Sequence, residues 1–172
     1  MISGDYNRDP DPTCAPFEVV PCDVFISEAT FALPVYRWTP TATVAADIHA
    51  WWAANRERGL ASVLFAYALG KAQRVLVELA ALSTEPVYMH GAVENLVEAY
   101  REAGVAMLPT RMPAATRRAD YAGALVVAPP GAAGSPWMRR FGDAAVGDLA
   151  ETIALLVAGP RRVYASRDDR GA

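Results

Sequence analysis

Short apolar runs that alternate with amphipathic segments constrain the fold of this chain more than any other feature. Each run has the length and the composition of a buried strand, and the segments between them place apolar residues at helical spacing. We expect strands at 62–67, 86–90 and 122–128 and helices at 43–57, 71–82 and 92–103. Because strands joined through helices form right-handed crossovers, the pattern predicts an α/β fold with a mainly parallel, Rossmann-like sheet.

The two ends of the chain differ from this central part. Residues 5–22 are polar and rich in proline, which predicts an extended loop, and a short run of strand type follows at 23–27. Near the other end, Val146, Leu149, Ile153 and Leu156 keep helical spacing and predict an amphipathic helix. We therefore expect three segments, at 1–35, 36–143 and 144–172.

Charge and hydropathy exclude some classes of function. No apolar run reaches the roughly 20 residues that span a bilayer, and the N-terminus lacks the features of a signal peptide, so we expect a cytoplasmic protein with no membrane partner. The net charge of −3 does not indicate nucleic-acid binding over the whole surface. Lys71 is the only lysine among sixteen cations. Arginine suits phosphate contacts, but a GC-rich coding sequence gives the same enrichment, which is the interpretation that we favour.

The histidine count limits metal chemistry. A dinuclear hydrolytic site needs several imidazoles as well as carboxylates, and this chain has only His49 and His90. Cys14 and Cys22 do not have the spacing of a metal knuckle, so we interpret them as reduced structural thiols. Any two-metal chemistry therefore needs ligands that this sequence does not supply.

Candidate ligand-binding residues follow the predicted strands, where parallel sheets collect ligands. They are Glu28, Gly70-Lys71, His90-Gly91 and 131–135. Turn residues occupy the same places in any such sheet. Gly70-Lys71 does not belong to an ATP-binding P-loop, because Phe65 and Ala72 stand where that motif needs Gly and Ser or Thr. Two interpretations stay open, a phosphate-binding helix start and a plain helix N-terminus.

Single polar residues carry little weight by themselves. Asp5 and Glu28, each taken alone, are typical of surface acids, and His90 is typical of a structural histidine after a strand. Trp51-Trp52 indicates a core position with one lateral contact. Two histidines do not allow a convincing Ser/His/Asp or Cys/His arrangement.

Several stretches taken together carry a more specific signal. Four stretches resemble, in order and spacing, four motifs of the metallo-β-lactamase/β-CASP nucleases. They are Ser3-Gly4-Asp5-Tyr6, the run Asp23 to Phe31, the run Val63 to Gln73 and the run Leu125 to Gly131. The proline-rich opening and the segment Tyr88 to Glu94 look most like the bacterial ligase-associated DNA exonucleases. The resemblance covers residues 1 to about 143. It implies that 1–35 is a piece of a metallo-β-lactamase sheet and that 36–143 is a Rossmann-like β-CASP domain, followed by a helical tail at 144–172 that does not follow the family.

The resemblance implies specific roles for four positions. Asp5 matches an aspartate that bridges two divalent metal ions, usually zinc, which activate a water for attack on a phosphodiester. Glu28 matches an acidic residue that orients a catalytic histidine. Lys71 and Gln73 lie in a motif that we expect to line the cleft for the nucleic-acid backbone. The implied function is metal-dependent DNA exonuclease activity in repair, with DNA as substrate and an ATP-dependent DNA ligase and a helicase as partners.

The departures from the family pattern are as informative as the matches. The histidine-rich motif that precedes the Gly-Asp-Tyr segment is missing, as are the late histidines, and Ala29 and Ala32 replace usual family residues. We therefore expect a fragment that retains one metal ligand, does not hold two zinc ions stably, and is inactive alone. The alternatives are a non-catalytic module that binds nucleic acid through Arg117 and Arg118 or binds a partner, and a poorly folded gene product.

Overall fold

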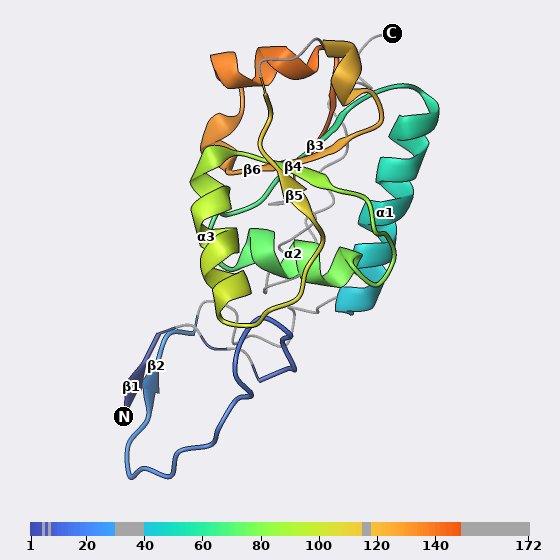
Figure 1. The fold of residues 1–172 in the computed structure, drawn as a ribbon. Helices are drawn as coiled ribbons and strands as arrows, with labels where there is room; N and C mark the ends of the chain where they lie inside the picture. Colours follow the sequence, from blue (N-terminus) through green and yellow to red (C-terminus); the bar gives the residue numbers. More distant parts are fainter. Residues whose placement is uncertain (5, 7, 30–39, 115–117, 149–172) are drawn as a thin grey trace, which may run out of the picture.

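The computed structural model describes residues 1–4, 6, 8–29, 40–114 and 118–148. Within these residues, five parallel strands form the central sheet (Figure 1). In order across the sheet these are β5 (Thr110–Arg111), β4 (Val87–Met89), β6 (Leu125–Ala128), β3 (Ser62–Phe65) and β7 (Ala145–Asp148). All neighbouring pairs are parallel, and β3 pairs with both β6 and β7. The predicted α/β fold with a Rossmann-like parallel sheet is confirmed.

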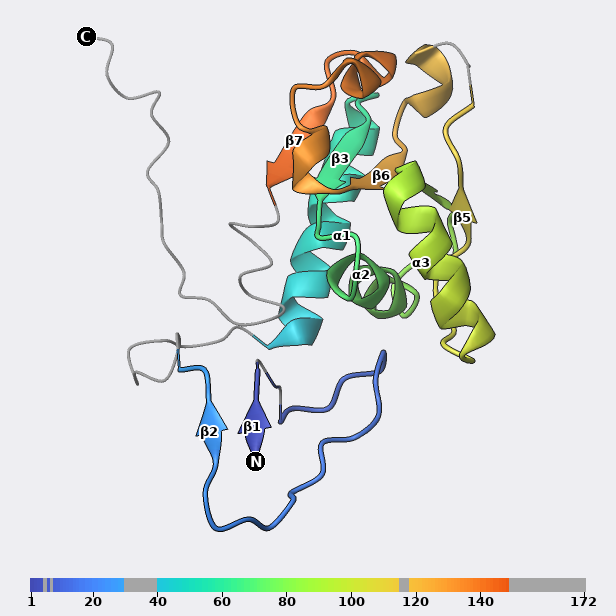
Figure 2. The same cartoon turned by 90° about the vertical axis from the view of Figure 1, so that its left-hand side faces the viewer.

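The two faces of the sheet are covered differently. Three α-helices cover one face, namely α1 (Thr41–Glu57), α2 (Lys71–Leu79) and α3 (Gly91–Glu102), as Figure 2 shows. Three short 3₁₀ segments cover the other, namely η1 (Arg118–Tyr121), η2 (Pro130–Ala132) and η3 (Pro136–Phe141). Alternate residues of each strand therefore contribute to two separate apolar cores. In β3, for example, Leu64 packs under the helices and Val63 packs under the 3₁₀ segments.

Helix α1 is fixed to the sheet by polar as well as apolar contacts. Trp52 is buried, and its indole Nε1 donates a hydrogen bond of 2.9 Å to the carbonyl of Gly123, in the turn before β6. Asn55 is also buried and donates to the hydroxyl of Ser62 at 3.1 Å, at the start of β3. Buried polar groups that are paired in this way set the register of the helix, because an unpaired group would carry a desolvation penalty. The prediction that Trp51-Trp52 contributes one core residue and one lateral contact is confirmed.

The structure corrects one local prediction near the end of the described residues. Val146 lies in strand β7, which pairs with β3, and not in the amphipathic helix expected there; the remaining positions of that helix, from 149 onward, lie outside the described residues. The N-cap position of α1 is Pro40, and no side-chain hydrogen bond caps the helix there. The three predicted segment boundaries remain predictions.

The N-terminal segment carries a second, two-stranded sheet outside the five-stranded one. Strands β1 (Ile2–Ser3) and β2 (Ile26–Ser27) pair in parallel, and the segment exposes many of its apolar side chains. These are Met1, Ile2, Tyr6, Phe17, Val19, Val20, Val24, Phe25 and Ile26. Cys14 and Cys22 are free and exposed, so packing in the core does not account for them.

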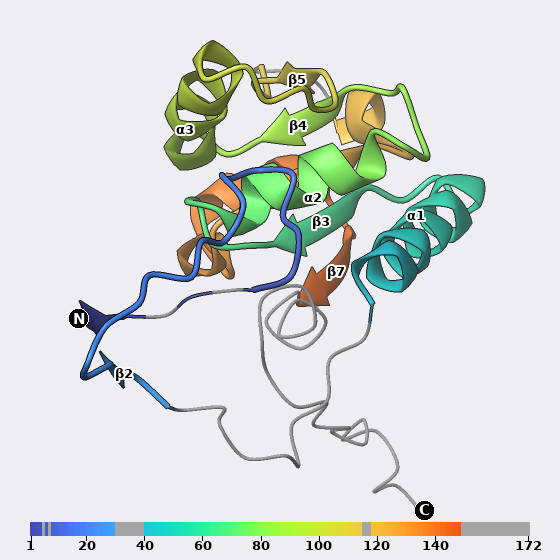
Figure 3. The same cartoon turned by 90° about the horizontal axis from the view of Figure 1, so that it is seen from below.

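A buried arginine connects the loop between β1 and β2 to α2, and Figure 3 shows that loop passing beside the helix. The side chain of Arg74 is only 5% exposed, and its Nη1 lies 2.8 Å from Oδ2 of Asp11. Nη2 of Arg74 donates to the hydroxyl of Thr41 at 3.0 Å, and Glu78 lies 3.8 Å from its Nε. One guanidinium thus joins the N-terminal loop, the start of α1 and the middle of α2. Within the described residues, no helix is both long and apolar enough to cross a bilayer.

Candidate functional site

The topology places a candidate site beyond the carboxyl end of β6. This strand lies between β3 and β4, and the chain leaves those two strands toward α2 and α3 on the helical face. After β6 the chain instead passes through η2 and η3 on the opposite face. Neighbouring strands whose connections leave toward opposite faces open a crevice at the sheet edge, where α/β proteins bind ligands. In Figure 1 the start of α3 and the orange 3₁₀ segments meet at this edge, on the left.

A tight turn presents a cation and an aromatic ring at the start of α2. Gly70 precedes the helix with φ +79°, in the left-handed region that glycine adopts without steric cost. Nζ of Lys71 lies 4.7 Å from the centre of the Tyr67 ring, and Tyr67 and Leu69 are exposed. A cation held on an exposed ring at a helix N-terminus can meet a phosphate with little loss of side-chain freedom.

Gln73 supports this turn from inside. Its side chain is fully buried, and Nε2 donates a hydrogen bond of 2.9 Å to the carbonyl of Ala68, while no described atom pairs with its Oε1. The sequence suggested that Gln73 lines the cleft for a nucleic acid. In the structure its buried side chain supports the turn that carries Lys71, and a role toward a nucleic acid stays a prediction.

His90 occupies the corresponding position at the start of α3. It is the N-cap residue, and its Nδ1 accepts a hydrogen bond of 3.1 Å from the backbone N–H of Ala92. Because Nδ1 accepts, the proton of the neutral imidazole is on Nε2, which makes Nε2 a donor. The backbone N–H of His90 donates to the carbonyl of Val127 at 2.9 Å, which fixes the residue to β6.

Aromatic and basic residues of η3 surround the His90 ring. The centre of the Trp137 indole lies 4.7 Å from the imidazole centre in an edge-to-face arrangement, and Phe141 contacts the same indole at 4.9 Å. The guanidinium of Arg140 lies over the Trp137 ring at 5.3 Å. Desolvation by burial lowers the pKa of His90 below its usual value, and the positive charge of Arg140 lowers it further. This edge of the sheet therefore carries donors and positive charge.

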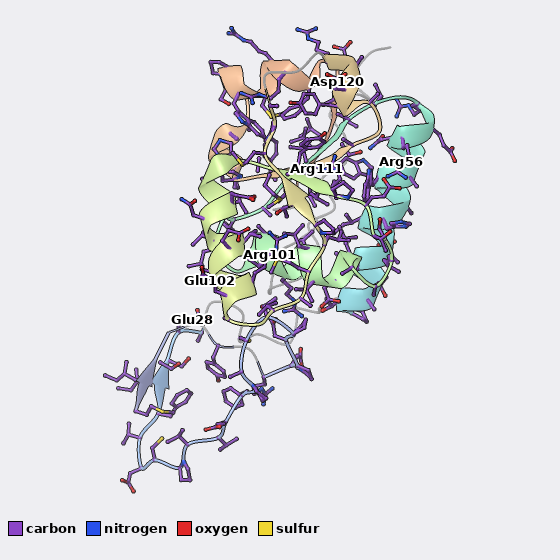
Figure 4. All side chains as sticks on the ribbon, viewed as in Figure 1. Glu28, Arg56, Arg101, Glu102, Arg111 and Asp120 are labelled. Atoms are coloured by element: carbon purple, nitrogen blue, oxygen red, sulfur yellow. The ribbon has the colours of Figure 1, made fainter. Side chains whose placement is uncertain are left out.

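The structure separates the residues that the sequence predicted for the site. Asp5 and Arg117 lie outside the described residues. Glu28 is exposed in the N-terminal segment, and Figure 4 shows it at the opposite end of the molecule from Asp120, which belongs to η1 together with Arg118. Lys71 follows the carboxyl end of β3, whereas η1 precedes β6 and so lies toward the amino edge of the sheet. Lys71 and Arg118 are therefore not brought together at one edge.

The described part of the chain does not by itself form a metal centre. No group of three His, Cys, Asp or Glu side chains among its residues could hold a metal ion. The described residues thus do not fit a two-metal site. An open hollow lies elsewhere, at the C-terminal end of α2 against α1. Its volume is about 440 Å³, and its lining includes His49, Ser83 and Glu85. Its residues do not converge on a reactive group, so we base the candidate site on the carboxyl edge.

Sequence reasoning missed the cluster of His90, Trp137 and Arg140. It interpreted His90 as an isolated structural histidine, because no spacing rule connects His90 to residues of η3. The available signal was the aromatic and basic composition of Pro136–Phe141 directly after the predicted strand and turn at 122–131. A short basic and aromatic segment that follows a central parallel strand lies at the edge where ligands bind.

The chain is similar in sequence to part of a known protein. The chain is 32% identical over 142 residues to a protein of Opitutus terrae named "Probable DNA ligase". The aligned part covers 82% of this chain but only 14% of that protein, so the chain spans a small part of the length of its relative. No family model matches the chain.

Proposed function

We propose that this chain is the DNA-contacting α/β part of a DNA-processing protein of the metal-dependent exonuclease class, and that it binds the nucleic-acid backbone at the carboxyl edge of its sheet. The observation that carries the proposal is the similarity over 142 residues to a protein named as a probable DNA ligase. It agrees with the sequence resemblance to ligase-associated exonucleases. The positions of Lys71 and Arg140 at the edge where such sheets bind ligands support a backbone-binding role.

The hydrolytic part of the proposal rests on residues beyond those described. Two divalent ions, with zinc the first choice, would activate water and stabilise the charge that develops on a phosphodiester. Asp5 and Glu28 are the residues proposed for that centre, and Asp5 lies outside the described residues, among which no three His, Cys, Asp or Glu side chains could hold a metal ion. We propose that this chain contributes substrate binding and that most metal ligands come from other parts of the intact protein. A DNA ligase and a helicase of the same pathway are the proposed partners.

A second candidate function is a non-catalytic nucleic-acid-binding module. The lack of a three-ligand cluster in the described part of the chain favours it. The two candidates differ in metal content and in product. Metal analysis of the purified chain, together with a DNA degradation assay with added zinc or manganese, distinguishes them. Two stoichiometric zinc ions and degraded DNA would show that the chain itself holds the catalytic centre.

The binding proposal is tested by the salt dependence of DNA affinity. Fluorescence anisotropy with a labelled DNA strand should give an affinity that falls linearly with salt on logarithmic axes, because phosphate contacts release counterions. Lys71→Gln should reduce that slope by about 1 if Lys71 contacts a phosphate. Arg58→Gln is the matched control, because Arg58 is an exposed cation at the far end of α1. Absence of salt-dependent binding, or equal effects of both substitutions, would contradict the proposal.

A further inference from the structure

Arg140 differs from the other partly or fully buried arginines in having no acidic partner. Within the described residues each of those arginines forms an ion pair, Arg74 with Asp11 and Arg101 with Glu98. Arg140 is half-buried and forms no ion pair in the same part of the chain. Its Nε donates to the backbone carbonyl of Trp137 at 3.0 Å, and its Nη1 lies 3.5 Å from the carbonyl of Pro113. These bonds orient the guanidinium but do not neutralise it.

His90 presents a second donor at the same place. Its Nδ1 is occupied by the N–H of Ala92, and its Nε2 has no hydrogen-bond partner among the described residues. The nearby carboxylate of Glu94, one turn further along α3, is directed to the hydroxyl of Thr110, at 3.4 Å. The imidazole is therefore fixed with a donor that still lacks an acceptor.

The Trp137 indole holds both donors in position. The His90 ring packs against it at 4.7 Å, and the Arg140 guanidinium lies over it at 5.3 Å. Phe141 packs edge-to-face against the same indole at 4.9 Å, and Tyr121 packs against Phe141 at 4.9 Å. Two groups that can both carry positive charge are thus fixed around one rigid ring, beside the N-terminus of α3, whose dipole also favours an anion. An anion between them would satisfy the donors and reduce their mutual repulsion.

The geometry points to a phosphate subsite in which His90 Nε2 and the Arg140 guanidinium, both positioned by Trp137, bind one backbone phosphate of a DNA strand. This inference rests on the proposed function for the identity of its ligand. It gives His90 a ligand-contacting role and places a second cation on the edge that carries Lys71. Because β3 and β4 flank β6, their carboxyl ends lie about 10 Å apart. Lys71 follows β3 and His90 follows β4, so the turn of Lys71 and the subsite lie along the same edge of the sheet.

The first test compares neighbouring arginines of η3. Arg140→Gln should weaken binding of a labelled DNA strand about tenfold, which is the typical effect of losing one charge-assisted hydrogen bond. Arg139→Gln is the matched control, because Arg139 is exposed and lies next to Arg140 in sequence. It should change the affinity less than threefold by general charge alone. Thermal melting of both variants separates loss of binding from loss of fold.

The second test follows His90 directly by NMR of ¹³C-labelled histidine, with His49→Gln used to assign the two signals. Added DNA should raise the pKa of His90 in the wild-type chain and not in Arg140→Gln. Inorganic phosphate serves as the second probe. A response to inorganic phosphate without any DNA binding would overturn the proposed function but retain an anion subsite. DNA binding that leaves His90 unchanged, with equal effects of the two arginine substitutions, would overturn the subsite and retain the function.

Discussion

Asp11→Asn tests whether the buried Arg74 attaches the N-terminal loop to the α/β domain. The substitution keeps the shape of the side chain but removes the charge that faces a guanidinium only 5% exposed. Removing one partner of a fully buried ion pair costs about 3–5 kcal/mol, and one hydrogen bond to a charged group contributes about 1.5–3 kcal/mol. Asp11 is 15% exposed, and Glu78 remains 3.8 Å from Arg74.

Because the Glu78 carboxylate still faces Arg74 in the variant, we expect a loss of unfolding free energy in the lower of these two ranges, at about 2 kcal/mol. For a chain of this length, such a loss lowers Tm by about 4–8 °C. The assay is urea unfolding together with a thermal melt, and limited proteolysis should show faster cleavage within residues 12–25. Asp23→Asn is the matched control, since Asp23 is an exposed acid of the same segment. If both variants unfold within about 0.5 kcal/mol of the wild type, Arg74 does not stabilise the chain through Asp11.

Two further predictions concern Gly123 and His90. Gly123→Ala should lower the free energy of unfolding in urea by about 2–4 kcal/mol, because φ is +74° and the added Cβ would lie 2.7 Å from Cγ of Arg56. Gly134→Ala is the control, with φ +68° and open space around the added Cβ, and it should cost only the backbone strain of about 1 kcal/mol. Equal losses in the two variants would contradict the steric argument. Burial and the charge of Arg140 lower the pKa of His90 in the folded state, so the unfolded state binds more protons. The free energy of unfolding should therefore fall as the pH drops below about 6.5, the usual pKa of histidine, and through the lowered pKa of the folded state. His90→Gln should reduce that part of the pH dependence, and an unchanged pH profile would exclude His90 as its source.

The central fold was predictable because its signals are local. The helix over Thr41–Glu57 and the strands at Ser62–Phe65 and Val87–Met89 follow from apolar periodicity and from nearby turn residues. Strand β7 was not predictable in this way. Val146 fits a helical stripe as well as a strand, and only pairing with β3, more than eighty residues earlier by sequence number, selects the strand.

The candidate site was predictable in its position but not in its composition. The rule that ligands gather at the carboxyl ends of parallel strands correctly places Lys71 and His90 at one edge. It does not indicate which residues of the 3₁₀ segments, on the other face of the sheet, contact Lys71 or His90. The contact between His90 and Trp137 depends on how η3 crosses the sheet, and that path is set by tertiary packing of Phe141 against Tyr121. Gln73 shows a related limit, because a polar residue in a ligand-like motif can equally face the core, where its side chain lies.

The position of β3 has a consequence for synthesis of the chain on the ribosome. Its two neighbours in the sheet, β6 and β7, are the last two strands of the described chain to emerge, whereas β4 and β5 can pair with each other earlier. Until then both edges of a strand made entirely of core residues are open to the wrong partners. A nascent chain that pauses before residue 125 would therefore expose its most apolar strand, and chaperone dependence should concentrate in that interval.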